Sequence, residues 1–135
     1  MTPRGIRLNN PGNIRHGDSW QGLSPTQDDP SFATFIAPEY GIRAMAKIMQ
    51  SYKAKGIKTL ADAINRWAPP SENETDAYVH DVSLRTGIDP TAVIDLASYT
   101  TCKNVIKAII FHENGQQPYS DDVISKGLAL AGIQP

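Results

Sequence analysis

The pattern of apolar and polar residues changes near residue 38 and divides the chain into two parts. Residues 1–38 are rich in Gly, Pro, Asn, Asp and Ser, and their short apolar pieces follow no helical period. From Pro38 onward, apolar residues recur every three or four positions, which predicts amphipathic helices. We therefore expect an α+β fold in a single, mostly helical domain over 1–135. A small β lobe with turns would occupy 1–38, and the helical part 39–135.

Start and stop signals for helices divide the second part further. Six helices are expected, at 38–56, 59–67, 73–86, 89–97, 102–113 and 121–131. Pro69-Pro70 ends the second, Gly87 ends the third, and Pro90 stands at a favoured first-turn position of the fourth.

Composition argues against several classes of protein. The chain has 135 residues, a formal net charge of −1 and a pI near 6.3, which argues against dedicated binding to bulk nucleic acid. No stretch approaches the roughly 18 apolar residues of a membrane span, and the N-terminal residues carry no Sec-type export signal. If the protein acts outside the cytoplasm, we expect something else to deliver it. The single cysteine, Cys102, lies on an apolar helix and is expected to be a small buried hydrophobe.

The helix expected at 102–113 carries the strongest candidate for chemistry. Its apolar residues recur at helical spacing, Glu113 stands at its end, and Gly115 follows as a helix stop. The negative end of the helix dipole and the apolar neighbours in sequence both disfavour ionisation of a carboxyl group. Such a place suits an acid that is kept protonated in order to donate a proton. The alternative is an ordinary solvated glutamate, and His112 beside it is expected to be a surface or supporting histidine.

Three segments together resemble one family of enzymes. NVIKAIIFHENGQQPYS, at Asn104–Ser120, resembles the helix of lysozyme-like lytic transglycosylases, whose catalytic glutamate follows an apolar run and precedes a small residue and Gly. NNPGNIR at Asn9–Arg15, followed by Trp20-x-Gly22, is similar to the hairpin region of lysozyme-like glucosaminidases and muramidases. WAPPSENETDAYVHDV, at Trp67–Val82, resembles the late Glu-Thr-Tyr segment of lytic transglycosylases.

The order of these segments differs from the order in the family. There the glutamate helix comes first and the β lobe, the helices and the Glu-Thr-Tyr segment follow, whereas here the glutamate helix comes last. The resemblance therefore implies a circularly permuted lysozyme-like domain, of the kind found in phage and prophage virion proteins. Permutation is physically reasonable because domain termini are exposed and often close. We expect the two ends of the chain to lie near each other, with the Glu113 helix central and residues 9–36 packed beside it.

The resemblance implies cleavage of the β-1,4 bond between N-acetylmuramic acid and N-acetylglucosamine in peptidoglycan. Glu113 would be the general acid and base of a lytic transglycosylase, or the acid of a muramidase or endolysin that also uses a second carboxylate. Asp28 is the nearest match to that second carboxylate, because Thr26-Gln27-Asp28 falls where related glucosaminidases carry Thr-x-Glu. The expected substrate-binding residues are Tyr78, Asn10, Asn13 and Gln27. The expected partner is the glycan strand, met from a phage virion or at the bacterial cell wall or periplasm. No nucleic acid, membrane, metal or cofactor is implied.

Each of these residues also has an ordinary structural interpretation. Asp28 lies in the turn Asp28-Asp29-Pro30, and Tyr78 is equally a half-buried core residue. The Asn side chains could equally hold a turn through bonds to the backbone. Glu72-x-Glu74 suits the first turn of a helix, and Trp67, like Trp20, is more often core than a platform for a sugar.

Other chemistries have weaker support in the sequence. The histidines lack metal-binding spacing, and there is neither a Gly-x-Ser-x-Gly elbow nor a phosphate loop. Arg4, Arg7 and Arg15 form a mild basic cluster that could favour an anionic polymer such as peptidoglycan, or could be solvated surface. The rival function of another class is a non-catalytic phage virion or cell-wall-binding protein with a lysozyme-like fold. A cleft around Glu113 would favour the enzyme, and a convex surface would favour the binder.

Overall fold

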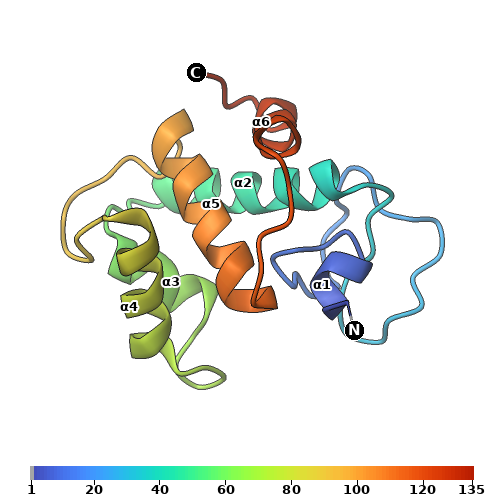
Figure 1. Ribbon diagram of the computed structural model, residues 1–135, viewed down its shortest axis with the longest axis horizontal. Coiled ribbons are helices and arrows are strands. Elements are labelled where there is room, and N and C mark those ends of the chain that lie inside the picture. Colours follow the sequence, from blue (N-terminus) through green and yellow to red (C-terminus); the bar gives the residue numbers. More distant parts are fainter. Residues whose placement is uncertain (1) are drawn as a thin grey trace.

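The computed structural model describes residues 2–135, most of which are helical (Figure 1). Six helices follow one another along this described length: α1 Arg4–Arg7, α2 Pro38–Ala54, α3 Leu60–Trp67, α4 Thr75–Thr86, α5 Tyr99–Asn114 and α6 Asp121–Leu130. Helices α2 to α6 confirm five of the helices that apolar periodicity predicts. Helix α1 was not expected, because four residues are too few to show a period.

The ends of these helices follow the local sequence. Thr59 and Ser120 cap α3 and α6, and each side-chain oxygen accepts a hydrogen bond from the backbone N–H three residues further on. Gly87 and Gly115 end α4 and α5 with φ of 74° and 71°. This left-handed conformation favours glycine, so the predicted stop after Glu113 is confirmed.

The prediction of a helix at 89–97 is wrong, because the backbone there is bonded to other partners. Asp89 Oδ1 accepts from the Thr91 N–H, and Asp95 Oδ1 accepts from the Ala97 N–H, so aspartates hold two local turns. The Ile94 N–H donates to the Lys58 carbonyl, which ties the segment to the residues before α3. Bonds of these kinds replace the i to i−4 bonds of a helix.

The expected β lobe is barely present. In the described chain, pairing of the β type is limited to three isolated antiparallel bridges, and two of them, Arg15 with Phe32 and Leu23 with Phe35, lie in the N-terminal part. Backbone bonds accompany these bridges, such as Ser24 N–H to the Thr34 carbonyl and Ile36 N–H to the Gly22 carbonyl. An amide side chain adds further bonds to the same segment. Gln27 Nε2 donates to the Thr34 carbonyl over 2.7 Å, and Gln27 Oε1 accepts from the Thr34 N–H over 2.9 Å. We call residues 9–36 the lobe.

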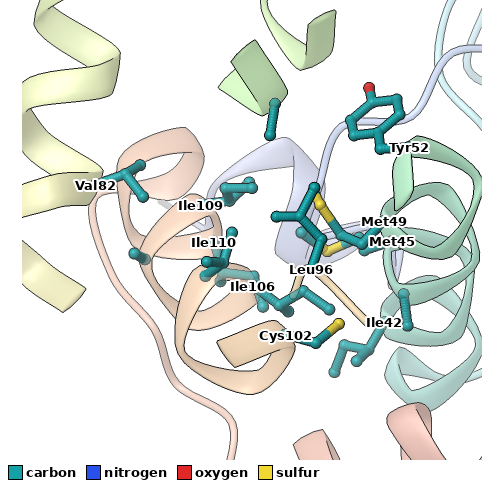
Figure 2. Close-up of a cluster of buried hydrophobic side chains, with 14 of the residues drawn as sticks. Ile42, Met45, Met49, Tyr52, Val82, Leu96, Cys102, Ile106, Ile109 and Ile110 are labelled. Carbon is teal, nitrogen blue, oxygen red and sulfur yellow. The ribbon is translucent and has the colours of Figure 1, made fainter. Parts of the chain in front are cut away.

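The main hydrophobic core lies between α5 and the helices around it. Figure 2 shows side chains of α2 and α5 pointing toward one another, with Leu96 between them and Val82 of α4 at the side of the cluster. Ile106, Ile109 and Ile110 are fully buried there. Cys102 is fully buried too, and burial raises the pKa of its thiol to about 12, so the expectation of a buried hydrophobe is confirmed.

Helix α6 packs across α2 and returns the chain over the body (Figure 1). The two helices approach closely at Gly127, where an added Cβ would stand 2.5 Å from Ile42 Cγ2. Any larger residue at this position would push the helices apart, because Ile42 is itself fully buried.

The two ends of the chain do not lie near each other, which corrects the expectation. Thr2 shares a surface hollow with Glu113 and Asn114 at the end of α5, whereas Pro135 shares one with Ser98 and Tyr99 at its start. A helix of 16 residues is about 24 Å long. The separation arises because α6 carries the chain back past α5. The other two expectations are confirmed, since α5 is central and the lobe packs beside its end (Figure 1).

Across residues 2–135, no helix combines the length and the apolar character needed to cross a membrane.

Candidate active site

Glu113 stands in the last turn of α5, where the helical body meets the lobe. Its side chain is half-buried and opens into a cleft of about 410 Å³. The walls come from α1, the lobe, α2, the end of α3 and the loop that follows α3. The lining residues are Arg4, Gly12, Asn13, Ile14, Arg15, Phe32, Ile48, Tyr52, Trp67, Ala68, Glu72, Asn73 and Glu113.

Two polar side chains, one on each side, bind the Glu113 carboxylate. Asn13 Nδ2 donates to Oε1 over 2.9 Å, and the Tyr78 hydroxyl donates to Oε2 over 2.7 Å. Two hydrogen-bond donors therefore surround the carboxyl group, in contrast to the apolar surroundings that the sequence suggests. The apolar neighbours, Ile109 and Ile110, face the core instead. A hydroxyl can also accept, so Oε2 can carry a proton and keep Tyr78 as its partner.

Tyr78 is a fixed, neutral donor. Its side chain is 2% exposed, and burial raises the pKa of its hydroxyl, with a further rise caused by the charge and hydrogen bond of Glu113. The hydroxyl therefore stays protonated at any physiological pH. The ring of Tyr78 lies against the His112 ring with 3.8 Å between the centroids. This contact fixes the position of the Tyr78 ring.

A second polar network supports this stack. His112 Nδ1 lies 2.8 Å from Asp81 Oδ2, and Arg85 Nε donates to both oxygens of Asp81. Burial acts to raise the pKa of Asp81, but the hydrogen bonds from His112 and Arg85 outweigh it and hold the pKa below its usual range. Asp81 thus stays a carboxylate that fixes the imidazole behind Tyr78, which suits the supporting role expected for His112.

The end of α5 is fastened to the beginning of the chain. Asn114 Nδ2 donates to the Pro11 carbonyl over 2.8 Å and to the Ile110 carbonyl over 2.9 Å. Gly5 lies directly against this junction, because an added Cβ would stand 2.6 Å from Asn114 Oδ1 and 2.7 Å from Asn13 Oδ1. Asn13 itself has a φ of 52°, a conformation that Asn tolerates better than most residues. The amide that contacts Glu113 is therefore held by its own backbone and by the closely packed Gly5.

Of the four residues expected to bind substrate, two lie beside Glu113. Asn13 and Tyr78 contact its carboxylate, although Tyr78 is too deeply buried to offer much surface to a ligand. The expectation that Asn10 binds substrate is wrong, because its side chain is fully buried and cannot reach a substrate. Its Nδ2 donates to the Ile14 and Ala33 carbonyls, and its Oδ1 accepts from the Ile14 N–H. This side chain holds the lobe together.

Gln27 and Asp28 belong to the turn of the lobe and do not line the cleft. The amide of Gln27 is occupied by the backbone of Thr34, as described above. Asp28 is exposed in that turn. Its neighbour Asp29 shapes the turn by accepting from the Ser31 and Phe32 N–H groups. The turn interpretation thus accounts for the local geometry, and the structure does not bring Asp28 to Glu113.

Sequence reasoning missed Glu72 as a possible second acid in the cleft. It reads as a helix-start acid in the sequence, but α4 begins later, at Thr75, and Glu72 lies in the preceding loop with its neighbour Asn73. The pair of prolines after Trp67 was the available signal, because such a loop must leave the helix and pass over the surface. Trp67 also lines the cleft, at the end of α3.

Comparison with known proteins finds a relative in a bacteriophage. No protein-family model matches the chain. Over 129 residues it is 40% identical to Protein P5 of Pseudoalteromonas phage PM2, a match that covers 92% of this chain and 79% of the phage protein. The chain belongs to the family of this phage protein. Membership in the Protein P5 family agrees with the bacteriophage context that the resemblance implies.

Proposed function

We propose that this protein cleaves the glycan strands of peptidoglycan, with Glu113 as general acid and base, in a circularly permuted lysozyme-like domain. The observation that carries the proposal is the cleft at Glu113, whose carboxylate is held by Asn13 and Tyr78 over 2.9 and 2.7 Å. Asn13 comes from the lobe segment and Tyr78 from the Glu-Thr-Tyr segment. All three segments of the resemblance therefore meet at one carboxyl group.

The junction at the end of α5 supports the permutation. In the family's order, the chain runs from the glutamate helix onward into the lobe. Here the same neighbourhood exists without that covalent order, because Asn114 donates to the Pro11 carbonyl and Gly5 packs on its side-chain oxygen. Contacts here join two segments that are covalently joined in the family, which supports the proposal of a permutation, while α6 carries the C-terminus away from this junction.

The transglycosylase reaction needs a single carboxyl group. Protonated Glu113 gives its proton to the glycosidic oxygen while the bond from that oxygen to C1 of the muramic residue breaks. The carboxylate then takes the proton of the 6-hydroxyl as that oxygen bonds to C1 and closes a 1,6-anhydro ring. No water is consumed, and Glu113 ends protonated as it began. Asn13 and Tyr78 stabilise the anion that exists between the two transfers.

A hydrolase needs a second carboxylate to assist an attacking water. Glu72 is better placed for this role than Asp28, because Glu72 lines the same cleft as Glu113. The mass of the products separates the reactions: a transglycosylase leaves anhydro ends, whereas a hydrolase leaves reducing ends that are heavier by one water. Retained activity in Glu72→Gln would support the single-carboxylate mechanism.

The decisive variant is Glu113→Gln, assayed on purified peptidoglycan. Gln keeps the size of Glu and can donate a hydrogen bond, but it cannot transfer a proton to the leaving oxygen. General acid–base catalysis contributes about 10²–10⁴-fold, so we expect at least this loss of rate with an unchanged thermal melt. Wild-type activity in the variant would disprove the role of Glu113. If the wild type degrades no peptidoglycan, the non-catalytic wall-binding function takes its place.

The phage relative suggests how such an enzyme would reach its substrate. A phage protein of this family would be carried with the virion to the cell wall or made inside the infected host.

A further inference from the structure

Two arginines share one aromatic ring in the cleft. The guanidinium carbon of Arg4 lies 3.9 Å from the centroid of the Phe32 ring, and that of Arg15 lies 4.9 Å from it. All three residues line the cleft that contains Glu113. Arg7, the third member of the basic cluster in the sequence, lines the neighbouring hollow instead. Of the three arginines in that cluster, Arg4 and Arg15 therefore line the cleft of the candidate active site.

This pair has little internal neutralisation. Within the described chain, neither Arg4 nor Arg15 forms an ion pair with a carboxylate. Asp29 is the nearby acid, and its pKa is lowered first by the Ser31 and Phe32 N–H groups and to a smaller extent by Arg4. Its Oδ1 is already occupied by those two N–H groups.

Stacking leaves the arginines prepared for a ligand. Each guanidinium carries five N–H donors in a planar fork that matches a carboxylate, and contact with a ring face does not use them. Two like charges that share one ring also repel each other. An anion placed between them would relieve this repulsion and accept hydrogen bonds from both.

We propose that Arg4 and Arg15 bind the carboxylates carried by the lactyl substituent of muramic acid, either the free lactyl acid or its attached peptide. This inference rests on the proposed function, because it names the part of the glycan strand that lies against Phe32. The inference also predicts the orientation of a glycan strand in the cleft, because charges of opposite sign line different parts of it. Glu72 lines the cleft from the loop after α3 and repels an anion that the two arginines attract. An uncharged strand of N-acetylglucosamine gains nothing from this difference.

The test measures binding in the Glu113→Gln background, so that cleavage does not interfere. Calorimetry compares three soluble probes: peptide-bearing muramic-acid oligosaccharides, the same strands with the peptide removed, and neutral N-acetylglucosamine oligomers. We expect Arg4→Gln and Arg15→Gln each to weaken binding of the peptide-bearing probe about fivefold, as for a partly exposed ion pair. Binding of the neutral oligomer should not change. Lys126→Gln, which removes an exposed charge on α6, is the matched control and should bind every probe as the parent does.

The two sources of the carboxylate are separated by the peptide-free strand. In the peptide-bearing probe the lactyl carboxyl is an uncharged amide. A loss of affinity confined to that probe therefore assigns the arginines to the peptide carboxylates, and a loss confined to the peptide-free strand assigns them to the free lactyl acid. A loss with both probes shows that the arginines bind either carboxylate. Equal binding of both acidic probes by the parent and both arginine variants would overturn the proposal. Arg4→Lys and Arg15→Lys keep the charge and should recover part of the affinity, which excludes a folding defect. Cleavage by the unmodified protein is assayed separately, so a failure of catalysis and a failure of carboxylate binding give different results.

Discussion

The lobe and the helical body are stabilised by different interactions. In the body, the main core is built from Ile, Leu, Met and other apolar residues of α2 to α6 and the loops between them. The lobe adds a much smaller apolar cluster around Ala33 and Phe35. Its backbone is held largely by side chains: Asn9 bonds the Phe35 carbonyl, Asn10 bonds Ile14 and Ala33, and Gln27 bonds Thr34. The body depends on apolar burial, and the lobe on directed polar bonds.

This difference explains where the candidate site lies. The body supplies Glu113 and its buried partner Tyr78 on helices that packing keeps rigid. The lobe supplies Asn13, Arg15 and Phe32 on irregular backbone, where polar groups can face a ligand. A cleft between two regions of different construction places a rigid acid against a wall rich in hydrogen-bonding groups.

The largest effect on stability should come from the body. Ile109→Ala removes a fully buried side chain of α5 from the core, and such changes cost about 2–5 kcal/mol of unfolding free energy. Chemical denaturation measures the loss. Leu84→Ala, at a side chain that is 69% exposed, is the matched control and should change stability by less than about 0.5 kcal/mol. Similar losses in the two variants would mean that apolar burial does not hold the body.

Sequence reasoning succeeded where a local pattern decides the structure. Periodic apolar residues placed α2 to α6, and Gly115 marked the end of α5, because a helix and its cap are set by residues within a few positions. The lobe shows no such period, and side chains such as that of Gln27 bind much of its backbone. The prediction for 89–97 failed for the same reason, because the side chains of Asp89 and Asp95 bind the backbone of its turns.

The site was only partly predictable, because its members meet through the fold. Glu113 could be found from its own helix. Its bond to Asn13 spans 100 residues of sequence, and no local pattern announces such a contact. Asn10 and Asn13 are indistinguishable in the sequence, yet one is buried in the lobe and the other faces the acid. Glu72 reached the cleft because the loop after α3 bends there, which depends on tertiary packing.

The next largest effect should come from the lobe. Asn10→Ala leaves the Ile14 N–H and the Ala33 carbonyl without partners, which costs about 1–3 kcal/mol. The Ile14 carbonyl loses one donor and keeps the Ala33 N–H. Hydrogen exchange should show faster exchange confined to the lobe, while α5 keeps its protection. Asn65→Ala, which removes an exposed amide of α3, should be neutral. Faster exchange throughout the body in Asn10→Ala would show that the two regions unfold together.

A smaller effect, seen in activity rather than in stability, is expected at the boundary. Tyr78→Phe removes the donor to Glu113 Oε2 and keeps the ring that packs on His112. Loss of a hydrogen bond to a charged group corresponds to about a 10- to 100-fold lower rate on peptidoglycan. Tyr119→Phe is the control, because the Tyr119 hydroxyl has no hydrogen-bond partner among residues 2–135. Equal rates in the wild type and Tyr78→Phe would remove Tyr78 from the catalytic arrangement.

The smallest effect is expected in the polar network of His112, Asp81 and Arg85, which lies behind the Tyr78 ring. The pKa of Asp81 is lower in the folded protein than in the unfolded chain, so its ionised form stabilises the fold. This contribution is complete above the unfolded pKa of about 4 and is lost as the pH falls through the folded pKa. Asp81 is 28% exposed, so its worth should stay below about 1 kcal/mol. Asp81→Asn should therefore be less stable than the wild type at pH 7, and the two should converge below about pH 4. Denaturation curves across this range decide the point, and a pH-independent difference would contradict it. In a His112→Gln background the difference should shrink, because Asp81 has then lost the imidazole that it holds behind Tyr78.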